Sequence, residues 1–412
     1  MSAQVRPGYK LTEAGVIPED WEVKKLGDIA IIATGSTPPT RDSANYGDEF
    51  LFVSPADLGD EKDVIDTQRK LTKKGFAISR RFPRDSILFV CIGSIGKCGV
   101  ASVDLTTNQQ INAIFPSPAF STDYLYYTVC AAAPKVRALA GEQVIPIVNK
   151  TQFSETPVSL PSIPEQRAIA AALSDMDALI SGLDQFIAKK RDIKQAAMQQ
   201  LLTGQQRLPG FSGEWTLKRT CELGEIVTGN TPSTTMAHYW GGDFPWITPT
   251  DISICRDMFE SSRLITIEGL QSIRRLPANT VLVTCIASIG KNAILRVEGA
   301  CNQQINAVIP SQKNSAEFLY YIFEASKEYL LSNAGTTATS IISKATFSEL
   351  TFRVPPLEEQ AAIATILSDM DSELSTLETR RNKARQLKQG MMQELLTGRI
   401  RLSQSSQEAK LW

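Results

Sequence analysis

Two long stretches of the chain repeat apolar residues at alternating steps of four and three, which is the pattern of a coiled-coil seam. The first stretch covers residues 169–201 and the second covers residues 363–395. Prolines precede both stretches, and Gly204 and Gly398 follow them, as is typical of helix starts and ends. Each stretch therefore predicts one helix of about 40 residues, with a length of about 60 Å at about 1.5 Å per residue.

The apolar seam contains one irregular step in each predicted helix. Two successive steps of three residues, close to Lys190 and Ala384, replace the expected alternation. Such a step predicts a stammer, a place where a coiled coil is locally overwound. The apolar seam residues are Ile169, Leu173, Met176, Ile180, Leu183, Ile187, Ile193, Ala197 and Leu201, and then Ile363, Leu367, Met370, Leu374, Leu377, Ala384, Leu387, Met391 and Leu395.

The remaining parts of the chain, about residues 1–155 and 205–349, contain short apolar runs that are broken by glycine and proline. Some of these runs have the length of strands and others have the length of helices. This mixture predicts an α/β or α+β globular fold with a mixed sheet. Strands are predicted at 87–92 and 280–286, and helices at 122–136 and 316–330.

The same motifs occur twice along the chain at a constant offset of 194 residues. The run TNQQINA at 107–113 returns as CNQQINA at 301–307, and TGSTPPT at 34–40 returns as TGNTPST at 228–234. The motifs SIGK, LYY, LSDMD and LLTG keep the same offset. The chain is therefore a tandem duplication in which each copy joins one globular part to one long helix.

The matched seams predict that the two long helices pair with each other. The first helix leads from the first globular part towards the second, so the pairing must be antiparallel, and one chain would mimic a dimer with pseudo-two-fold symmetry. The alternative is that each helix packs only on its own globular part. The predicted divisions are a globular domain at 1–157, a spacer helix at 158–204, a second globular domain at 205–351, a second spacer helix at 352–402 and a C-terminal tail at 403–412.

The composition excludes several classes of protein. The net charge is −1 and the pI is about 6.1, so any DNA affinity must come from local patches of positive charge. The amino-terminal sequence lacks the apolar core of a signal peptide, and the longest apolar runs are too short to cross a bilayer. The seven cysteines form no CxxC pair, which favours reduced thiols in the cytoplasm and no metal site.

Catalytic motifs are missing from the sequence. His238 is the sole histidine, so a nucleophilic triad that needs histidine can hardly be built. The Gly-Lys pairs in SIGK lack the other residues of a phosphate-binding loop, and no amino-methyltransferase motif is present. The acidic residues of the two LSDMD motifs are interpreted as an exposed helix face. These observations favour a binding protein over an enzyme.

Two related but unequal globular domains on a spacer suit a target that has two parts. Dimeric DNA-binding proteins read half-sites whose separation reflects the geometry of the protein. The loops at 36–49, 60–80, 230–243 and 254–275 differ between the two copies, so we predict that they read bases and that the target is asymmetric. Cations shared by both copies instead suit phosphates, which fix position and carry no sequence information.

Candidate DNA-binding residues follow from this distinction, with a merely solubilising surface as the alternative. The NQQ amides can pair with adenine in principle. Because they are identical in both copies, we favour hydrogen bonds to loop backbone or to phosphate over base readout. The predicted phosphate contacts are Thr37, Arg41, Arg80, Arg81, Lys97, Thr231, Arg274, Arg275 and Lys291. The predicted base-reading residues are Lys73, Lys74 and Arg263.

The doubled, ordered set of GxTP, SIGK, NQQ, EQxxIAxxLSDMD and LLTGxxRL resembles the specificity subunit of Type I restriction–modification systems, over nearly the whole chain. The resemblance implies two target recognition domains that bind double-stranded DNA, with the long helices as spacer and docking surface. It also implies a non-catalytic subunit that holds two methyltransferase subunits and, in some systems, two restriction or motor subunits. S-adenosylmethionine, ATP and Mg are then expected only on those partners, and no cofactor is expected on this chain.

Partner docking is predicted at the starts and outer faces of the long helices. The predicted docking residues are Glu165, Gln166, Arg191, Glu359, Gln360 and Arg385. The alternative for the whole chain is a coiled-coil adaptor whose two globular domains bind proteins and not DNA. Such an adaptor would show no salt-dependent binding to duplex DNA. A third alternative, a stand-alone methyltransferase, would bind S-adenosylmethionine without a partner.

Overall fold

The computed structural model describes residues 6–59, 61–141, 144–252, 256–335 and 340–402, so the predicted C-terminal tail lies outside the described residues. The chain divides into two compact units. The first unit comprises Met1–Leu183 with Arg380–Trp412, and the second comprises Asp184–Thr379. Each unit therefore holds one globular domain together with parts of both long helices. This division runs across the helices, whereas the sequence predicts separate helix segments.

The globular part of the first unit begins with a hairpin and ends at the first long helix. Its elements are β1 (Tyr9–Thr12), β2 (Gly15–Pro18), β3 (Glu22–Lys25), α1 (Leu26–Ile29), β4 (Ile32–Thr34), η1 (Ser43–Asn45), β5 (Tyr46–Gly47), β6 (Phe50–Val53), β7 (Asp63–Val64), β8 (Lys70–Leu71), α2 (Lys73–Ile78), β9 (Arg81–Phe82), β10 (Ile87–Val90), β11 (Cys98–Ala101), β12 (Leu105–Thr107), β13 (Ile111–Ile114), α3 (Thr122–Ala138), α4 (Lys150–Ser154) and β14 (Pro157–Leu160), followed by α5 (Ile163–Leu201).

The globular part of the second unit repeats most of these elements. They are β15 (Thr216–Arg219), α6 (Thr220–Leu223), β16 (Gly224–Thr228), η2 (Ala237–Tyr239), β17 (Trp240–Ile247), β18 (Asp257–Met258), β19 (Leu264–Ile265), α7 (Ile267–Gln271), β20 (Thr280–Thr284), β21 (Asn292–Leu295), β22 (Ala300–Cys301), β23 (Ile305–Pro310), α8 (Ala316–Ala325), α9 (Lys327–Ser332), α10 (Lys344–Glu349) and β24 (Thr351–Val354), followed by α11 (Leu357–Leu395).

The main sheet has the same strand order in both units. The first unit has the order β4-β13-β10-β11-β7, and the second has the order β16-β23-β20-β21-β18. The last pair in each sheet is parallel, and the other pairs are antiparallel. A second, smaller mixed sheet accompanies each main sheet: β5-β8-β6-β12-β9 in the first unit and β19-β17-β22 in the second. The predicted mixed-sheet fold and the duplication are confirmed.

The central strand β10 is buried on both faces, which explains why its sequence is a continuous apolar run. Ile87 and Phe89 point to the core that α3 covers, and Leu88 and Val90 point to the core shared with the smaller sheet. Alternate residues of a strand face opposite sides of its sheet, so one apolar run serves two cores. The predicted strands at 87–92 and 280–286 are therefore confirmed, although the regular strands end slightly earlier.

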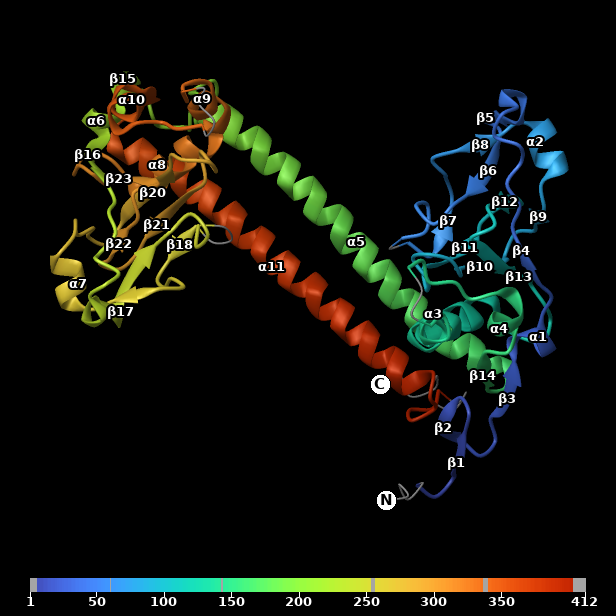
Figure 1. The fold of residues 1–412 in the computed structure, drawn as a ribbon. Coiled ribbons are helices and arrows are strands. Elements are labelled where there is room, and N and C mark those ends of the chain that lie inside the picture. The colour runs from blue at the N-terminus through green and yellow to red at the C-terminus, as the bar shows by residue number, and fades with distance from the viewer. Residues whose placement is uncertain (1–5, 60, 142–143, 253–255, 336–339, 403–412) are drawn as a thin grey trace. The chain divides into compact units, whose positions relative to one another are not determined.

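The two long helices run side by side in each unit, in opposite directions (Figure 1). In the first unit, Leu395 near the end of α11 joins the core that contains Ile169 near the start of α5. In the second unit, Leu201 at the end of α5 joins the core that contains Ile363 near the start of α11. Each helix is 39 residues long. The prediction of two paired antiparallel helices is confirmed, and the alternative of separate helices is wrong.

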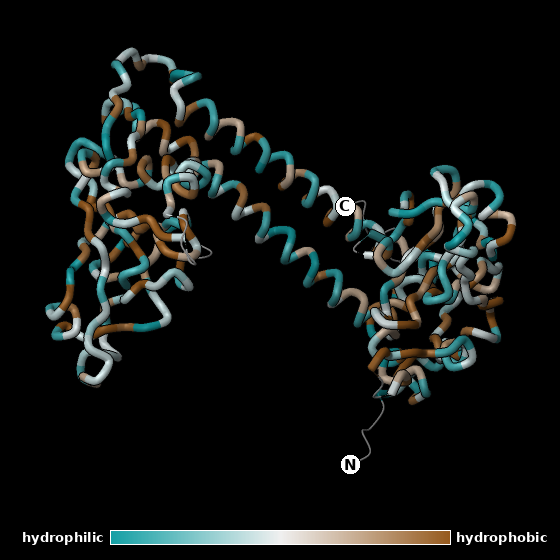
Figure 2. The backbone as a smooth tube through the Cα atoms, turned by 45° about the horizontal axis from the view of Figure 1, so that its top comes forward, coloured by the Kyte–Doolittle hydropathy of each residue, from teal (hydrophilic) through white to brown (hydrophobic). Residues whose placement is uncertain are grey.

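The predicted stammer is wrong, because polar residues occupy seam positions where we searched for apolar ones. Lys190 and Lys194 continue the alternation of four and three on α5, and both lie half-buried against carboxylates of α11. The predicted seam residue Ile193 is instead 43% exposed, and Leu387 on α11 is 56% exposed. Figure 2 shows hydrophobic and hydrophilic residues alternating along both helices.

The second predicted helix of the globular parts, at 316–330, is two helices. It breaks at Ser326, where α8 ends and α9 begins, whereas α3 in the first unit continues through Pro134. Among the described residues, no helix is long and apolar enough to cross a membrane.

Candidate nucleic-acid interface

The repeated GxTP and NQQ motifs form one continuous surface on each globular domain. The GxTP loop follows β4 and passes so close to the NQQ turn that its glycine has no room for a side chain. A Cβ atom on Gly35 would lie 2.0 Å from Thr107 Oγ1 and 2.3 Å from the Asn108 carbonyl oxygen. A Cβ atom on Gly229 would lie 2.2 Å from the Cys301 carbonyl oxygen. The glycine of this motif is therefore required for the contact between the two loops.

The three NQQ residues differ in their hydrogen-bond partners. Asn108 accepts a hydrogen bond from the Gln110 backbone (3.0 Å) and donates to its side chain (2.9 Å), and Asn302 makes the same pair of bonds with Gln304. These two amides hold the turn, which agrees with the predicted bonding to loop backbone. The middle residue, Gln109, is exposed and lies beside the GxTP loop.

The middle glutamine is tied to the threonine of GxTP in both units. Thr37 donates its hydroxyl to Gln109 Oε1 at 2.5 Å, and Thr231 donates to Gln303 Oε1 at 2.8 Å. Because each oxygen accepts a hydrogen bond inside the protein, the Nε2 group of each glutamine is the part of the amide that could donate to a ligand. A donor on an exposed surface suits a phosphate oxygen. Sequence reasoning named Thr37 and Thr231 and singled out the NQQ amides, but it did not predict that each threonine pairs with the middle glutamine.

A pair of equivalent arginines adds positive charge beside this surface. The side chain of Arg80 donates to the Thr34 carbonyl oxygen at 2.6 Å, and Arg274 donates to the Thr228 carbonyl oxygen at 2.7 Å. Both guanidinium groups are exposed, and no described carboxylate forms an ion pair with either. Their charge is thus held in place by neutral backbone oxygens, and the phosphate contacts of both arginines stay a prediction.

Stacked arginines form another shared feature of the two surfaces. The Arg263 guanidinium lies 3.7 Å from the centre of the Trp240 ring, and Arg69 lies 4.6 Å from the centre of the Tyr46 ring. The tyrosine in turn donates its hydroxyl to the Pro38 carbonyl oxygen of the GxTP loop at 2.8 Å. Arg69 stands at the position equivalent to Arg263, which sequence reasoning missed because the flanking residues differ. A feature common to both halves favours a phosphate contact over the predicted base readout by Arg263.

The other predicted DNA contacts differ in how much of their charge is free. Arg275 forms an ion pair with Glu298, and Lys74 forms an ion pair with Asp42 at 2.7 Å, so their charges are compensated within the fold. Arg81 stacks on the Phe76 ring at 4.9 Å. Lys97 donates to the Pro55 carbonyl oxygen at 3.0 Å. The side chains of Arg41, Lys73 and Lys291 are exposed and form no ion pair among the described residues.

The short helices α2 and α7, which lie within the variable segments 60–80 and 254–275, differ in charge. Helix α2 begins with Lys73 and Lys74, whereas the equivalent helix α7 begins with Ile267 and Glu268. The first domain therefore carries more positive charge at this position than the second domain does.

Four of the predicted docking side chains are buried inside the fold. Gln166 accepts from the Ser121 backbone at 2.8 Å and donates to the Pro161 carbonyl oxygen, and Gln360 repeats these bonds with Ser315 and Pro355. Buried side chains with these partners hold the helix starts on the globular domains. Their prediction as an exposed docking surface is therefore corrected.

The neighbouring glutamates of the EQ motifs are equally internal. Glu165 is bound by two nitrogens of Arg401, and Glu359 by two nitrogens of Arg207, at distances of 2.6–2.9 Å. Each arginine comes from the segment that follows the other long helix, so the motif joins both helices to one domain. Of the predicted docking residues, Arg191 is exposed and paired with Glu378, and Arg385 lies on an exposed helix position.

Comparison with known proteins places these features in one family. The model of the Type I restriction modification DNA specificity domain matches residues 18–190 and 212–386. The Type I restriction enzyme MjaIX specificity subunit of Methanocaldococcus jannaschii is 37% identical over 164 residues, which are 38% of this chain and 38% of that relative. The MjaVIII specificity subunit of the same organism is 23% identical over 420 residues, which are 94% of each chain.

A solved structure has the same fold over nearly the whole length. The S subunit of a Type-I restriction-modification system from M. genitalium superimposes with a TM-score of 0.60 at 14% identity, over 94% of this chain and 98% of that chain. At this identity the likeness shows a shared fold.

Proposed function

Because the chain belongs to the family of Type I restriction–modification DNA specificity proteins, we propose that it selects the DNA target of such a system. It reads an asymmetric target in two parts, with one half-site for each globular domain. The chain is the non-catalytic subunit, and methyl transfer belongs to partner subunits. S-adenosylmethionine, ATP and Mg are bound by those partners, and two methyltransferase subunits assemble on each chain, with two restriction or motor subunits in addition where the system cleaves DNA.

The observation that carries this proposal is the contrast between shared and unshared surfaces. Both domains present the same Thr–Gln pair, the same backbone-held arginine and the same stacked arginine. These groups donate hydrogen bonds and carry positive charge, so they suit the phosphate backbone, which is alike in every sequence. The loops around them differ, so they supply the base contacts that make the two half-sites different.

Sequencing of modified adenines in the host, with and without this gene, tests the proposal. We expect one asymmetric motif with an unspecified gap to lose its modification when the gene is deleted and to regain it when the gene is restored. Purified chain without partners should transfer no methyl groups to DNA. An unchanged modification pattern, or methyl transfer by the chain alone, would contradict the proposal. Absence of salt-dependent binding to duplex DNA would favour the protein-binding adaptor instead.

A further inference from the structure

One carboxylate in each unit joins a helix of the globular domain to both long helices. In the first unit this carboxylate is Asp177 on α5. Tyr127 of α3 donates its hydroxyl to Asp177 Oδ2 at 2.7 Å, and Lys388 of α11 lies 2.5 Å from Asp177 Oδ1. Three elements that are distant in the sequence therefore meet at a single side chain.

The second unit repeats this cluster with the long helices exchanged. Asp371 now lies on α11, Tyr321 of α8 donates to it at 2.6 Å, and Lys194 of α5 forms the ion pair. Each lysine also lies over the tyrosine ring of its cluster, at 5.3 Å for Lys388 and 5.8 Å for Lys194. The repeated LYY and LSDMD motifs thus meet in one structure. The interpretation of these acidic residues as an exposed helix face is correct for Asp175 but wrong for Asp177.

The side chains of both clusters are partly buried, so their hydrogen bonds and ion pairs can fix the position of the tyrosine relative to the long helices. The side chains of Asp177 and Lys388 are 32% and 23% exposed, and those of Asp371 and Lys194 are 32% and 19% exposed. Burial raises the pKa of the Tyr127 and Tyr321 hydroxyls well above their usual value, so both remain protonated donors. A half-buried ion pair that also accepts a hydrogen bond is less screened by water than a surface pair.

The tyrosine-bearing helices belong to the DNA-reading domains. Helices α3 and α8 cover one face of the main sheet, and Tyr127 and Tyr321 themselves lie in the domain cores. A shift of either helix on the long helices would carry the whole sheet with it, because packed cores move as rigid bodies. Each cluster therefore connects one of these domains to both long helices through a single carboxylate.

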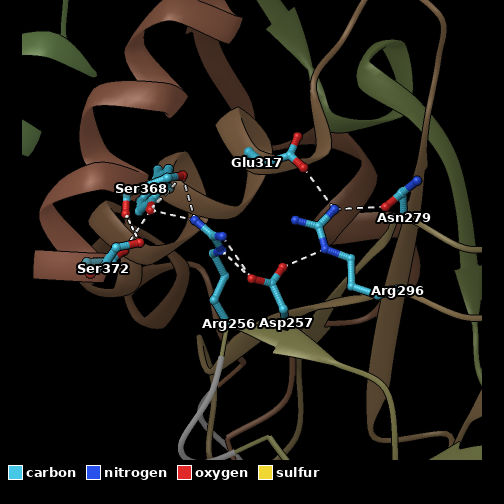
Figure 3. Close-up of polar contacts among 9 residues, drawn as sticks. Arg256, Asp257, Asn279, Arg296, Glu317, Ser368 and Ser372 are labelled. Carbon is cyan, nitrogen blue, oxygen red and sulfur yellow. Dashed lines mark hydrogen bonds and ion pairs between the residues drawn. The ribbon is translucent and has the colours of Figure 1, made fainter. Parts of the chain in front are cut away.

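Among the described residues, the second unit has an additional connection to α11 that the first unit lacks. Arg256, which precedes β18, donates to the Tyr321 hydroxyl at 2.9 Å and to Ser368 of α11 at 2.5 Å (Figure 3). It also forms an ion pair with Asp257 at 2.8 Å. In the first unit the equivalent residue is Lys62, which instead pairs with Asp123 of α3 at 2.8 Å.

Asp257 anchors this additional tie to the sheet. Figure 3 shows its carboxylate between Arg256 and Arg296, and Arg296 continues the network to Glu317 at 2.8 Å. Burial opposes the ionisation of Asp257, but hydrogen bonds from both arginines hold its pKa below the usual value. The network stays charged at neutral pH and connects the edge strand of the sheet to α8 and α11.

We propose that Asp177 and Asp371 are positioning residues for target recognition. By fixing the angle of each reading domain on the helix pair, they set the gap between half-sites that the assembled complex accepts. This inference rests on the proposed function. Because Arg256 holds the second domain independently, loss of Asp177 has a larger effect than loss of Asp371 alone.

The test uses the full chain assembled with the methyltransferase subunits of its own system and maps modified sites by sequencing. We expect the wild-type complex to modify one gap length. Asp177→Asn should lower the discrimination against gaps one base pair shorter or longer by about tenfold, with the bases of both half-sites unchanged. Tyr127→Phe, which keeps the ion pair, should shift the discrimination in the same direction by less. Asp371→Asn should have a small effect that the double variant with Arg256→Gln enlarges.

Asp175→Asn is the matched control, because Asp175 is an exposed carboxylate in the same motif. Unchanged gap discrimination in Asp177→Asn overturns the inference, as does an equal loss of modification at every gap, which would indicate a purely structural role. An effect of Asp175→Asn as large as that of Asp177→Asn overturns it as well. If the wild-type complex itself modifies no gapped motif, the proposed function fails, which is a separate outcome.

Discussion

The exposed glutamine of each NQQ turn shows how two side chains can present one donor to DNA. Thr37 donates its hydroxyl to Gln109 Oε1, so the Nε2 group is the part of the amide that could donate to a ligand. Neither side chain is charged, so the pair adds orientation and not long-range attraction. In the proposed function, Arg80 and Arg69 supply the attraction. A phosphate bound here would meet both a fixed donor and a fixed positive charge.

Gln109→Glu should weaken DNA binding by about tenfold, because the new carboxylate still accepts from Thr37 but repels a phosphate. The loss should be equal for target and unrelated duplexes, since a phosphate contact carries no sequence information. Fluorescence anisotropy of the assembled complex on both duplexes would measure it. Gln185→Glu, at an exposed position of α5, is the control for added charge. A loss confined to the target duplex would show that Gln109 reads a base.

Gly35→Ala should destabilise the first domain, because its Cβ atom would lie 2.0 Å from Thr107 Oγ1. Overpacking of this kind costs about 1–3 kcal/mol, and DNA binding should fall with it as the two loops separate. The midpoint of the unfolding transition measures the first effect. Gly59→Ala is the control, since a Cβ atom there meets nothing within 4 Å. Equal stability of the two variants would be inconsistent with the close approach of the loops.

At the scale of elements, the long helices were predictable in type and length but not in their polar contacts. The apolar residues at alternating steps of four and three predicted two helices and their pairing. Lys190 and Lys194 occupy seam positions that apolar patterning cannot identify, because a lysine in a helix usually indicates solvent. Only the carboxylates of α11 make these positions suitable for a lysine, and the sequence does not show which carboxylate lies opposite.

The prediction that the EQ motif is an exposed docking surface was wrong for a related reason. Glu165 looks exposed in the sequence, and its partner Arg401 stands more than half the chain away. The glutamine beside it is satisfied by backbone groups that no pattern reveals. By contrast, duplication alone singled out the GxTP and NQQ loops, although it could not show that the two loops contact each other. Repetition identifies important residues, and only the fold separates those that bind a ligand from those that hold the domain.

Arg401→Met should destabilise the first unit by about 1–3 kcal/mol, because it leaves the nearly buried carboxylate of Glu165 without its partner. Arg401 is itself partly exposed, so the loss should stay below that of a fully buried pair. Thermal unfolding of the full chain measures the shift. Arg399→Met removes an exposed pair with Glu394 and should change stability by about 0–1 kcal/mol. If the two variants unfold alike, the EQ motif is not held as described.

At the scale of the whole molecule, the two domains are equal in architecture and unequal in charge. In the proposed function, the Thr–Gln pair and the two arginines that both domains share give each domain the same phosphate contacts. Helix α2 adds Lys73 and Lys74 to the first domain, where α7 has Ile267 and Glu268. The first half-site should therefore contribute more of the salt-dependent affinity than the second.

Replacing Lys73 by Ile and Lys74 by Glu gives α2 the first two residues of α7. This double substitution should make DNA binding less dependent on salt. The slope of log affinity against log salt concentration should decrease in magnitude by about one, at about 0.9 for the phosphate contact of Lys73, because Asp42 already compensates the charge of Lys74. The reciprocal change, Ile267→Lys with Glu268→Lys, should increase it. Titrations of the assembled complex at several salt concentrations give both slopes. Equal slopes for all three proteins would exclude an asymmetric charge contribution.

The central claim is that each globular domain reads its own half of the target. The most direct test replaces residues 1–155 with the equivalent segment of a relative and maps modified adenines in cells that carry the exchanged chain and its methyltransferase subunits. The account predicts that one half-site changes, while the other half-site keeps its bases. A change in both half-sites, or in neither, would contradict it.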